Sequence, residues 1–231
     1  MDYFSQSRES VEIFDTDTAH PKLSAHFVGR STVIDLDTVR DRVSLFDRLA
    51  APSAEVQVVD VATHAFKKFF DLMRESDYVA EARARNIETV IFYIPEYDGE
   101  SYDQGHALME RFADCAFVTA ENENLGEIET TARLAEGYRA RRQHERRMLI
   151  PRLDSLFALA LAESKLSLGD FLRDPPLDRT PAYNSIAYAS SHMRAGIERF
   201  AKSMFEQIGL AMLGVGAGVA VESAQSDAPS S

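Results

Sequence analysis

Residues 11–21 read VEIFDTDTAHP, and this stretch decides the fold on which the rest of the chain is built. Its first four residues form a short run of β-forming type that leads directly into Asp15 and Asp17. A strand that ends on carboxylates and continues into a loop is typical of open α/β sheets, where ligands bind beyond the carboxyl ends of the strands. The stretch therefore predicts a parallel sheet with an acidic site at its edge.

Two further apolar runs end in the same way. The run TVI leads into Asp35 and Asp37, and the run VQVV leads into Asp60. Carboxylates at three strand ends predict Mg²⁺ together with a phosphate ligand, because Mg²⁺ is usually held by one or two carboxylates and by phosphate oxygens. For Asp35 and Asp37 a structural role is favoured, since Asp37 and Thr38 make a suitable N-cap for the following helix.

Asp15, Asp17 and Asp60 also have a structural alternative. Aspartate is common in loops and at helix starts because its side chain forms local hydrogen bonds. The functional hypothesis is that Asp15 and Asp17 are metal or water ligands near a phosphate, and that Asp60 is a carboxylate of Walker B type that holds Mg²⁺ through water. Spacing alone leaves both interpretations open.

The chain alternates apolar strands with amphipathic helices. This alternation predicts an α/β fold with a mostly parallel sheet, flanking helices and right-handed crossovers. The run IETVIFYIP is apolar almost throughout, which predicts a central strand buried on both faces. From periodicity we expect strands at about 11–14, 31–36, 55–60, 88–95, 115–119 and 148–151, the last at an edge, and helices at about 38–50, 64–84, 101–113, 127–146, 153–163, 167–173 and 182–213. The first residues, 1–10, are typical of the last turns of a helix.

Composition places limits on function. The chain has 231 residues and a net charge of −12, so broad attraction to nucleic acid or to an anionic membrane is not expected. No secretory signal is visible, which makes the cytoplasm the expected location. The apolar end at residues 208–221 falls short of the ~20 residues that span a bilayer, so no membrane span is expected. An α/β domain is expected over 1–173, a helical extension over 174–221 and a disordered tail over 222–231.

Arginines gather in one part of this acidic chain. Within the helix expected at 127–146, Arg139, Arg142 and Arg146 fall on one face by the spacing of three and four. One hypothesis is a weak contact with the DNA backbone, which requires positive charge but no base-reading groups. The alternative is a solvated helix face whose charge is balanced by neighbouring glutamates.

Five stretches, in this order, resemble the ParA/MinD family of deviant P-loop ATPases, in particular its plasmid conjugal-transfer, TraL-like branch. The resemblance covers most of residues 10–172 and implies a three-layer fold like that of P-loop NTPases. It also implies binding of ATP and Mg²⁺, slow hydrolysis, a homodimer or other protein partner, and a role in plasmid transfer, mobilisation or partition. The stretches are VEIFDTDTAHPKLS, EVQVVDVATHAFKKFFDLM, ETVIFYIPEYDGES, FVTAENENLGE and MLIPRLDSLFALALAESKLSLGDFL.

The resemblance also implies roles for individual residues. The aspartate pair would contact the nucleophilic water and Mg²⁺, with Asp17 in the catalytic role and Asp15 at the metal. Asp60 would be the Walker B carboxylate, also at the metal. The residues that would contact the base are Asn122, which helps to read it, and the turn at Ile150 and Pro151, which packs against the adenine.

The family's phosphate-binding loop is not found in these residues. No G-x-x-x-x-G-K-[ST] motif occurs, and the central strand that should precede it is also missing from the expected fold. Either Met1 is an internal methionine and the loop lies upstream, or the chain is a remnant that acts as a non-enzymatic adaptor. We favour the first explanation, because a protein freed from ATP chemistry has no physical need for three carboxylates. The 231-residue chain by itself is expected to be inactive as an ATPase.

Overall fold

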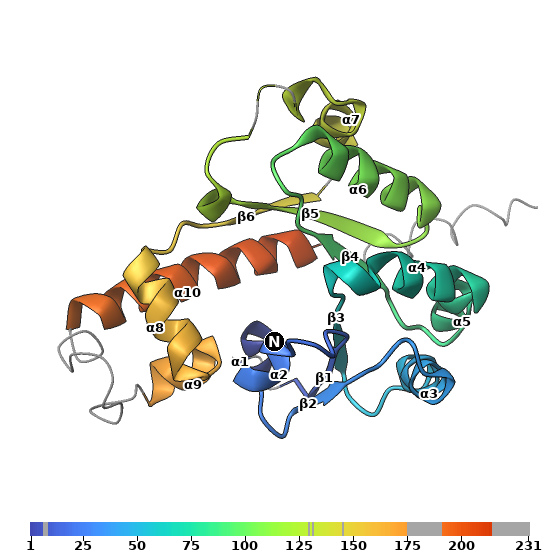
Figure 1. The fold of residues 1–231 in the computed structure, drawn as a ribbon, viewed down its shortest axis with the longest axis horizontal. Coiled ribbons are helices and arrows are strands. Elements are labelled where there is room, and N and C mark those ends of the chain that lie inside the picture. Colours follow the sequence, from blue (N-terminus) through green and yellow to red (C-terminus); the bar gives the residue numbers. More distant parts are fainter. Residues whose placement is uncertain (7–8, 129, 131, 145, 175–190, 214–231) are drawn as a thin grey trace, which may run out of the picture. The chain divides into compact units, whose positions relative to one another are not determined.

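The computed structural model describes residues 1–6, 9–128, 130, 132–144, 146–174 and 191–213 (Figure 1). The expected proline-rich connection, the first part of the last expected helix, at 182–190, and the expected tail at 222–231 lie outside these residues, as does most of the apolar end at 208–221. The chain forms two compact units. The first comprises Met1–Ile87 and Leu153–Lys202, and the second comprises Glu88–Arg152 and the chain from Ser203.

The first unit is built around a parallel sheet with the strand order β2-β1-β3. A short helix, α1, lies where the first residues were expected to be helical. The elements of this unit are α1 (Asp2–Gln6), β1 (Val11–Asp15), α2 (Lys22–His26), β2 (Ser31–Val33), α3 (Val39–Ala50), β3 (Val56–Asp60), η1 (Thr63–Ala65), α4 (Phe66–Glu75), α5 (Tyr78–Ala84), α8 (Ser155–Ser164), α9 (Leu168–Arg173) and the first part of α10 (Ser191–Met212).

β1 is the central strand of this sheet and carries part of its core. Phe14 is fully buried, and the guanidinium of Arg48 in α3 lies 4.6 Å from the centre of its ring. Arg48 also forms an ion pair with Glu12, and Gln57 of β3 donates a hydrogen bond to the same carboxylate at 2.7 Å. Phe14 and Glu12 of β1 thus both contact Arg48 and hold α3 against the sheet.

The helices after β2 and β3 differ in how well their sequence pattern predicted them. The helix expected at 38–50 is confirmed as α3, and the hydroxyl of its N-cap Thr38 accepts the N–H of Asp41 at 3.2 Å. The single helix expected at 64–84 is wrong, because α4 ends at Glu75 and α5 begins at Tyr78. Asp77 between them has φ 52°, a left-handed conformation that an α-helix does not continue.

The second unit contains a parallel sheet with the strand order β4-β5-β6. Val118 and Ala120 of the central strand β5 form a buried cluster with Met148 of β6 and Ala211 of α10. The elements of this unit are β4 (Val90–Tyr93), α6 (Gly99–Arg111), β5 (Ala116–Asn122), η2 (Glu123–Leu125), η3 (Ala132–Leu134), α7 (Glu136–His144), β6 (Arg146–Ile150) and the last part of α10.

Of the two edge strands of this second sheet, one was expected at an edge and the other was expected at the centre. β6 is an edge strand, as expected, and the N–H of Leu149 donates to the side chain of Gln207 at 3.0 Å. The prediction that β4 is central is wrong, since β4 lies at the other edge and Phe92 is 40% exposed. An apolar run shows that side chains can be buried, but it does not show how many strands lie beside it.

The helix expected at 127–146 is also wrong. The structure has a short 3₁₀ turn, η3, then α7 from Glu136 to His144, and Arg146 already belongs to β6. α7 packs closely on α6: the N–H of Gly137 donates to Asp103 at 2.9 Å, and a Cβ at Gly137 would lie 2.4 Å from the carbonyl oxygen of Tyr102. Arg146, which was expected to end this helix, instead pairs with β5 as the first residue of β6.

Three helices late in the chain share a small core in the first unit. Ala160 of α8, Phe171 of α9 and Ile197 of α10 are buried together. The helices expected at 153–163 and 167–173 are thereby confirmed as α8 and α9. In the part of the chain that the structure describes, none of the helices combines the length and apolar character needed to cross a membrane.

All four strand pairings among the described residues are parallel, so the expected parallel α/β class is confirmed. The strands form two sheets of three strands each, where one sheet was expected. β3 and β4 follow one another along the chain, yet each is an edge strand and they belong to different sheets.

Candidate acidic site at the ends of β1 and β3

The parallel register brings the ends of β1 and β3 together. Asp15 lies opposite Asp60 in the strand pairing. After this pair, the buried Thr16 connects the ends of β1 and β3, because its N–H and its hydroxyl both donate to the carbonyl of Asp60, at 3.0 and 2.9 Å. The same hydroxyl accepts the N–H of Ala62 at 2.9 Å. The two strand ends are therefore locked to each other before either loop begins.

Asp15 is 1% exposed, and both of its carboxylate oxygens accept backbone hydrogen bonds. Oδ1 accepts the N–H of Asp17 at 3.0 Å, and Oδ2 accepts the N–H of Ser24 in α2 at 2.9 Å. The carboxylate thus closes the turn after β1 and holds α2 to the strand end. Both of its oxygens are therefore already engaged by the backbone of the loop.

Asp17 is partly exposed and organises the next turn. Its Oδ1 accepts the N–H groups of Ala19 and His20, at 3.2 and 2.8 Å. The hydrogen bond from His20 is the main reason that the pKa of Asp17 lies below its usual value, and the charge of His64 lowers it further. Asp17 is therefore an ionised carboxylate at the surface of the loop.

Asp60 ends β3, and the residue as a whole is exposed, although its carboxyl group is partly shielded from water. Loss of hydration around its carboxyl raises the pKa of Asp60, and the negative charges of Asp15 and Asp17 raise it further. Asp15 lies opposite Asp60 in the strand pairing and Asp17 follows two residues later, which brings both negative charges near Asp60. We call Asp15, Asp17 and Asp60 the acidic rim.

The other strand-end aspartates have structural partners. Asp35 accepts the N–H of Asp37 at 2.8 Å, and Asp37 forms an ion pair with Lys68 of α4. The hydrogen bond from Lys68 is the main reason that the pKa of Asp37 is lowered. Asp35 and Asp37 thus belong to the turn that leads into the helix capped by Thr38, which agrees with the structural role expected for them.

His64 is the residue near the acidic rim that the sequence pattern did not reveal. It lies in η1, four residues after Asp60, and its charge acts on both Asp17 and Asp37. No metal-binding spacing singles it out among the histidines. Its position shortly after a strand end that carries a carboxylate is the one signal in the sequence that could have found it.

Asn122, Ile150 and Pro151 come together at the ends of β5 and β6 in the second unit. Asn122 lies opposite Ile150 in the strand pairing. Asn122 accepts the backbone N–H of Asn124 at 3.1 Å, and the side-chain amide of Asn124 donates to the carbonyl of Pro151 at 3.2 Å. The predicted base-binding residues thus form one local cluster, and the acidic rim forms another in the first unit.

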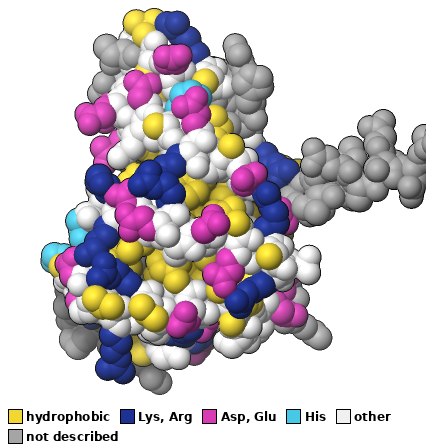
Figure 2. All heavy atoms as spheres, turned by 90° about the vertical axis from the view of Figure 1, so that its right-hand side faces the viewer, with side chains coloured by type: hydrophobic (Ala, Val, Ile, Leu, Met, Phe, Trp, Pro, Cys, Tyr) yellow, Lys and Arg dark blue, Asp and Glu magenta, His cyan; other side chains and the backbone are white. Residues whose placement is uncertain are grey.

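The predicted arginine face requires a correction. Arg139 is exposed on α7, but Arg146 begins β6 and cannot share a helix face with it. The side chain of Arg142 lies outside the described residues. Figure 2 shows a face of the molecule on which Lys and Arg side chains lie beside Asp and Glu side chains. Contact with DNA through these arginines stays a prediction, without the helix face on which it was based.

The acidic rim can be compared with what a metal ion requires. Within the described ranges, no group of three or more His, Cys, Asp or Glu side chains is placed to hold a metal ion. Mg²⁺ does not need such a cage, because it keeps several waters and uses one or two carboxylates with substrate phosphates. The hydroxyl of Ser24, whose N–H binds Asp15, is buried without a hydrogen-bond partner among the described residues. The residues fit a hydrated Mg²⁺ and do not fit an all-protein cage.

No protein-family model, curated protein or solved structure matches this chain. The resemblance to the ParA/MinD family therefore stays a prediction that rests on the sequence stretches given above.

Proposed function

We propose that this chain is part of a nucleotide-binding protein of the ParA/MinD type, in which the acidic rim holds hydrated Mg²⁺ beside the phosphates of ATP. The observation that carries the proposal is the gathering of three carboxylates at the ends of two adjacent parallel strands. Loss of hydration, with added repulsion from Asp15 and Asp17, raises the pKa of Asp60, and a divalent cation would relieve the repulsion.

Each member of the acidic rim has a role that its contacts suggest. The carboxylate of Asp60, unlike its backbone carbonyl, accepts no hydrogen bond from the described residues, so its two oxygens can bind the water shell of the ion. Asp17, ionised on the loop, can orient a water molecule near the phosphates. Asp15 contributes negative charge near Asp60 and holds the loop after β1 through its two backbone hydrogen bonds. Bound Mg²⁺ would neutralise the charge on the transferring phosphoryl group.

The phosphates would be held by a loop that these 231 residues do not contain. The resemblance implies that this loop follows a further strand, and no G-x-x-x-x-G-K-[ST] motif occurs in the 231 residues. The 231-residue chain should therefore bind Mg²⁺ weakly and should not hydrolyse ATP. Asn122, Ile150 and Pro151 remain the proposed contacts of the base.

Thermal unfolding tests the proposal. It is measured for the 231-residue chain and for the protein isolated from its native host, each with Mg²⁺, with ATP and with both. A ligand at about 100 times its Kd stabilises the folded state by about 2.7 kcal/mol, which corresponds to a rise of about 5–10 °C in Tm. We expect this rise with Mg²⁺ and ATP together in the protein from the host, and only a small response to Mg²⁺ in the 231-residue chain.

Asp60→Asn supplies the site-specific variant, and Asp37→Asn is its matched control. Both remove a carboxylate from an exposed strand-end residue, but Asp37 pairs with Lys68 and lies outside the acidic rim. The response to Mg²⁺ should disappear in Asp60→Asn and persist in Asp37→Asn. Equal responses in the two variants, or no response of either protein to Mg²⁺ with ATP, would overturn the proposal.

A non-enzymatic adaptor is the second candidate function. The observation that favours it is the exposure of large apolar side chains at the end of α10, where Leu210 is 63% and Leu213 is 70% exposed. Such residues are suited to contact with a second copy or another protein. Sedimentation of the wild type and of a Leu210→Glu/Leu213→Glu variant tests it. A complex lost in the variant supports the adaptor, and a monomer in both cases contradicts self-association.

A further inference from the structure

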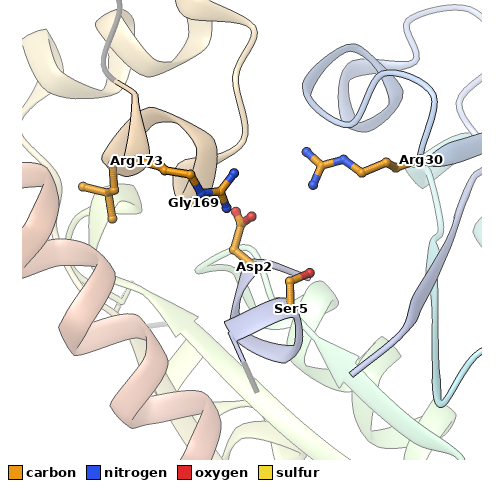
Figure 3. A pocket seen from close by; sticks show the side chains of 6 residues that line it. Asp2, Ser5, Arg30, Gly169 and Arg173 are labelled. Carbon is orange, nitrogen blue, oxygen red and sulfur yellow. The ribbon is translucent and has the colours of Figure 1, made fainter. Parts of the chain in front are cut away.

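A small pocket of about 350 Å³ lies in the first unit, away from the residues of the acidic rim. It is lined by Asp2 and Ser5 of α1, by Gly169, Leu172 and Arg173 of α9, and by Arg30 from the turn before β2. Figure 3 shows the guanidinium groups of Arg30 and Arg173 pointing toward each other across the pocket, with Asp2 and Ser5 between them. Its volume is at the lower end of the range for small-molecule sites.

Two arginines are held at this pocket by one carboxylate. Asp170 accepts Arg30 at 2.5 Å through Oδ2 and Arg173 at 3.0 Å through Oδ1. Each contact uses one nitrogen of a guanidinium group that has five N–H donors in a planar fork. Donors on both arginines therefore remain for a ligand, and their fork matches the two oxygens of a carboxylate or a phosphate.

The floor of the pocket has the opposite charge. The buried hydroxyl of Ser167 lies 2.9 Å from Asp2 Oδ1 and 2.9 Å from Asp170 Oδ2, and its single proton can be donated to either carboxylate. Asp2 makes no ion pair with either arginine within the described residues, and its second oxygen is left as an acceptor. Gly169 lies against it, where an added Cβ would be 2.8 Å from Asp2 Oδ1.

We propose that this pocket binds a small ligand that carries an oxyanion, placed between Arg30 and Arg173, and a neighbouring hydrogen-bond donor that binds Asp2. The oxyanion is a phosphate monoester or a carboxylate, and the donor is a hydroxyl or an ammonium group. Arg30 and Arg173 bind different oxygens of Asp170, and this brings two guanidinium groups to one pocket. The site uses no residue of the acidic rim, so it is independent of the proposed function.

Calorimetric titration of the 231-residue chain tests the site with two probes. Glycerol 3-phosphate offers a phosphate monoester with hydroxyl donors, and glycine offers a carboxylate with an ammonium donor. Sodium chloride at matched ionic strength controls for charge screening. We expect saturable binding of one probe, which then identifies the class of ligand. Absence of saturable binding for both would overturn the proposal.

Variants locate the binding on the pocket. Arg30→Gln and Arg173→Gln should each weaken binding about tenfold or more, because each removes charge-assisted hydrogen bonds. Arg194→Gln, on α10 of the same unit, removes the same charge from an ion pair with Glu198 and should have no effect. Gly169→Ala leaves all charges in place and should weaken binding by displacing Asp2. Equal affinities of Arg30→Gln and Arg194→Gln, with both variants folded by circular dichroism, would contradict the assignment.

Discussion

Asp15 and Asp60 lie opposite each other in the sheet, yet their replacement should change stability in opposite directions. Asp15→Ala removes the acceptor of two backbone hydrogen bonds, from Asp17 at 3.0 Å and from Ser24 at 2.9 Å. Asp60→Asn removes a charge whose ionisation the folded state disfavours, as its raised pKa indicates. One carboxylate supports the fold, and the other opposes it.

The magnitude for Asp15 follows from its contacts. A hydrogen bond to a charged group contributes about 1.5–3 kcal/mol, so two of them amount to about 3–6 kcal/mol. Relief of the repulsion between Asp15 and Asp60 offsets part of this loss. We expect Asp15→Ala to lower the free energy of unfolding by about 2–4 kcal/mol, a large part of the 5–15 kcal/mol that is usual for a domain.

Urea denaturation at pH 7 measures both effects on the same scale. Asp60→Asn should unfold at the same urea concentration as the wild type or at a higher one, and Asp15→Ala should unfold at a clearly lower one. Asp15→Asn keeps one acceptor and should fall between Asp15→Ala and the wild type. The reasoning would be refuted if Asp15→Ala lost less than about 0.5 kcal/mol, the size of an ordinary surface substitution.

Four further predictions concern pH and packing. The raised pKa of Asp60 means that its ionised form destabilises the fold, so the gain in free energy of unfolding from Asp60→Asn should grow as the pH rises from about 3 to 7. The lowered pKa of Asp17 has the opposite sign, so the loss of free energy of unfolding in Asp17→Asn should vanish at the acid end of this range. Denaturation across that range measures both, and parallel curves would contradict them. Gly137→Ala should cost about 1–3 kcal/mol, because its Cβ would meet backbone of α6, and an unchanged Tm would contradict this packing. Gln207→Ala should cost about 1 kcal/mol through loss of the hydrogen bond at the edge of β6, and faster amide exchange at Leu149 should accompany it.

Elements whose limits depend on local sequence could be predicted. α3 begins after Thr38 because a hydroxyl at that position caps the helix, and the apolar runs before Asp15 and Asp60 form strands. The break between α4 and α5 depends on the left-handed conformation of Asp77, for which the apolar stripe of Phe and Met residues gave no signal. Where periodicity continues through a break, sequence reasoning joins two helices into one.

Features that depend on neighbours distant in the sequence could not be predicted. β4 is apolar, but its position at a sheet edge depends on which strands pair with it. Arg146 follows a helix of suitable composition, and pairing with β5 places it in a strand. The acidic rim was predictable because parallel strands end at the same edge. The hydrogen bond from Ser24 to Asp15 was not, because it requires the path of the loop and α2.

The most direct test of the account is a titration of the protein with Mn²⁺, which binds carboxylate oxygens as Mg²⁺ does and broadens nearby NMR signals. The account predicts selective broadening of the backbone amide signals of Asp15, Asp17 and Asp60, reversal by excess Mg²⁺, and loss of the effect in Asp60→Asn but not in Asp37→Asn. Broadening spread over many acidic residues, or unchanged in Asp60→Asn, would contradict the claim that the acidic rim is a cation site.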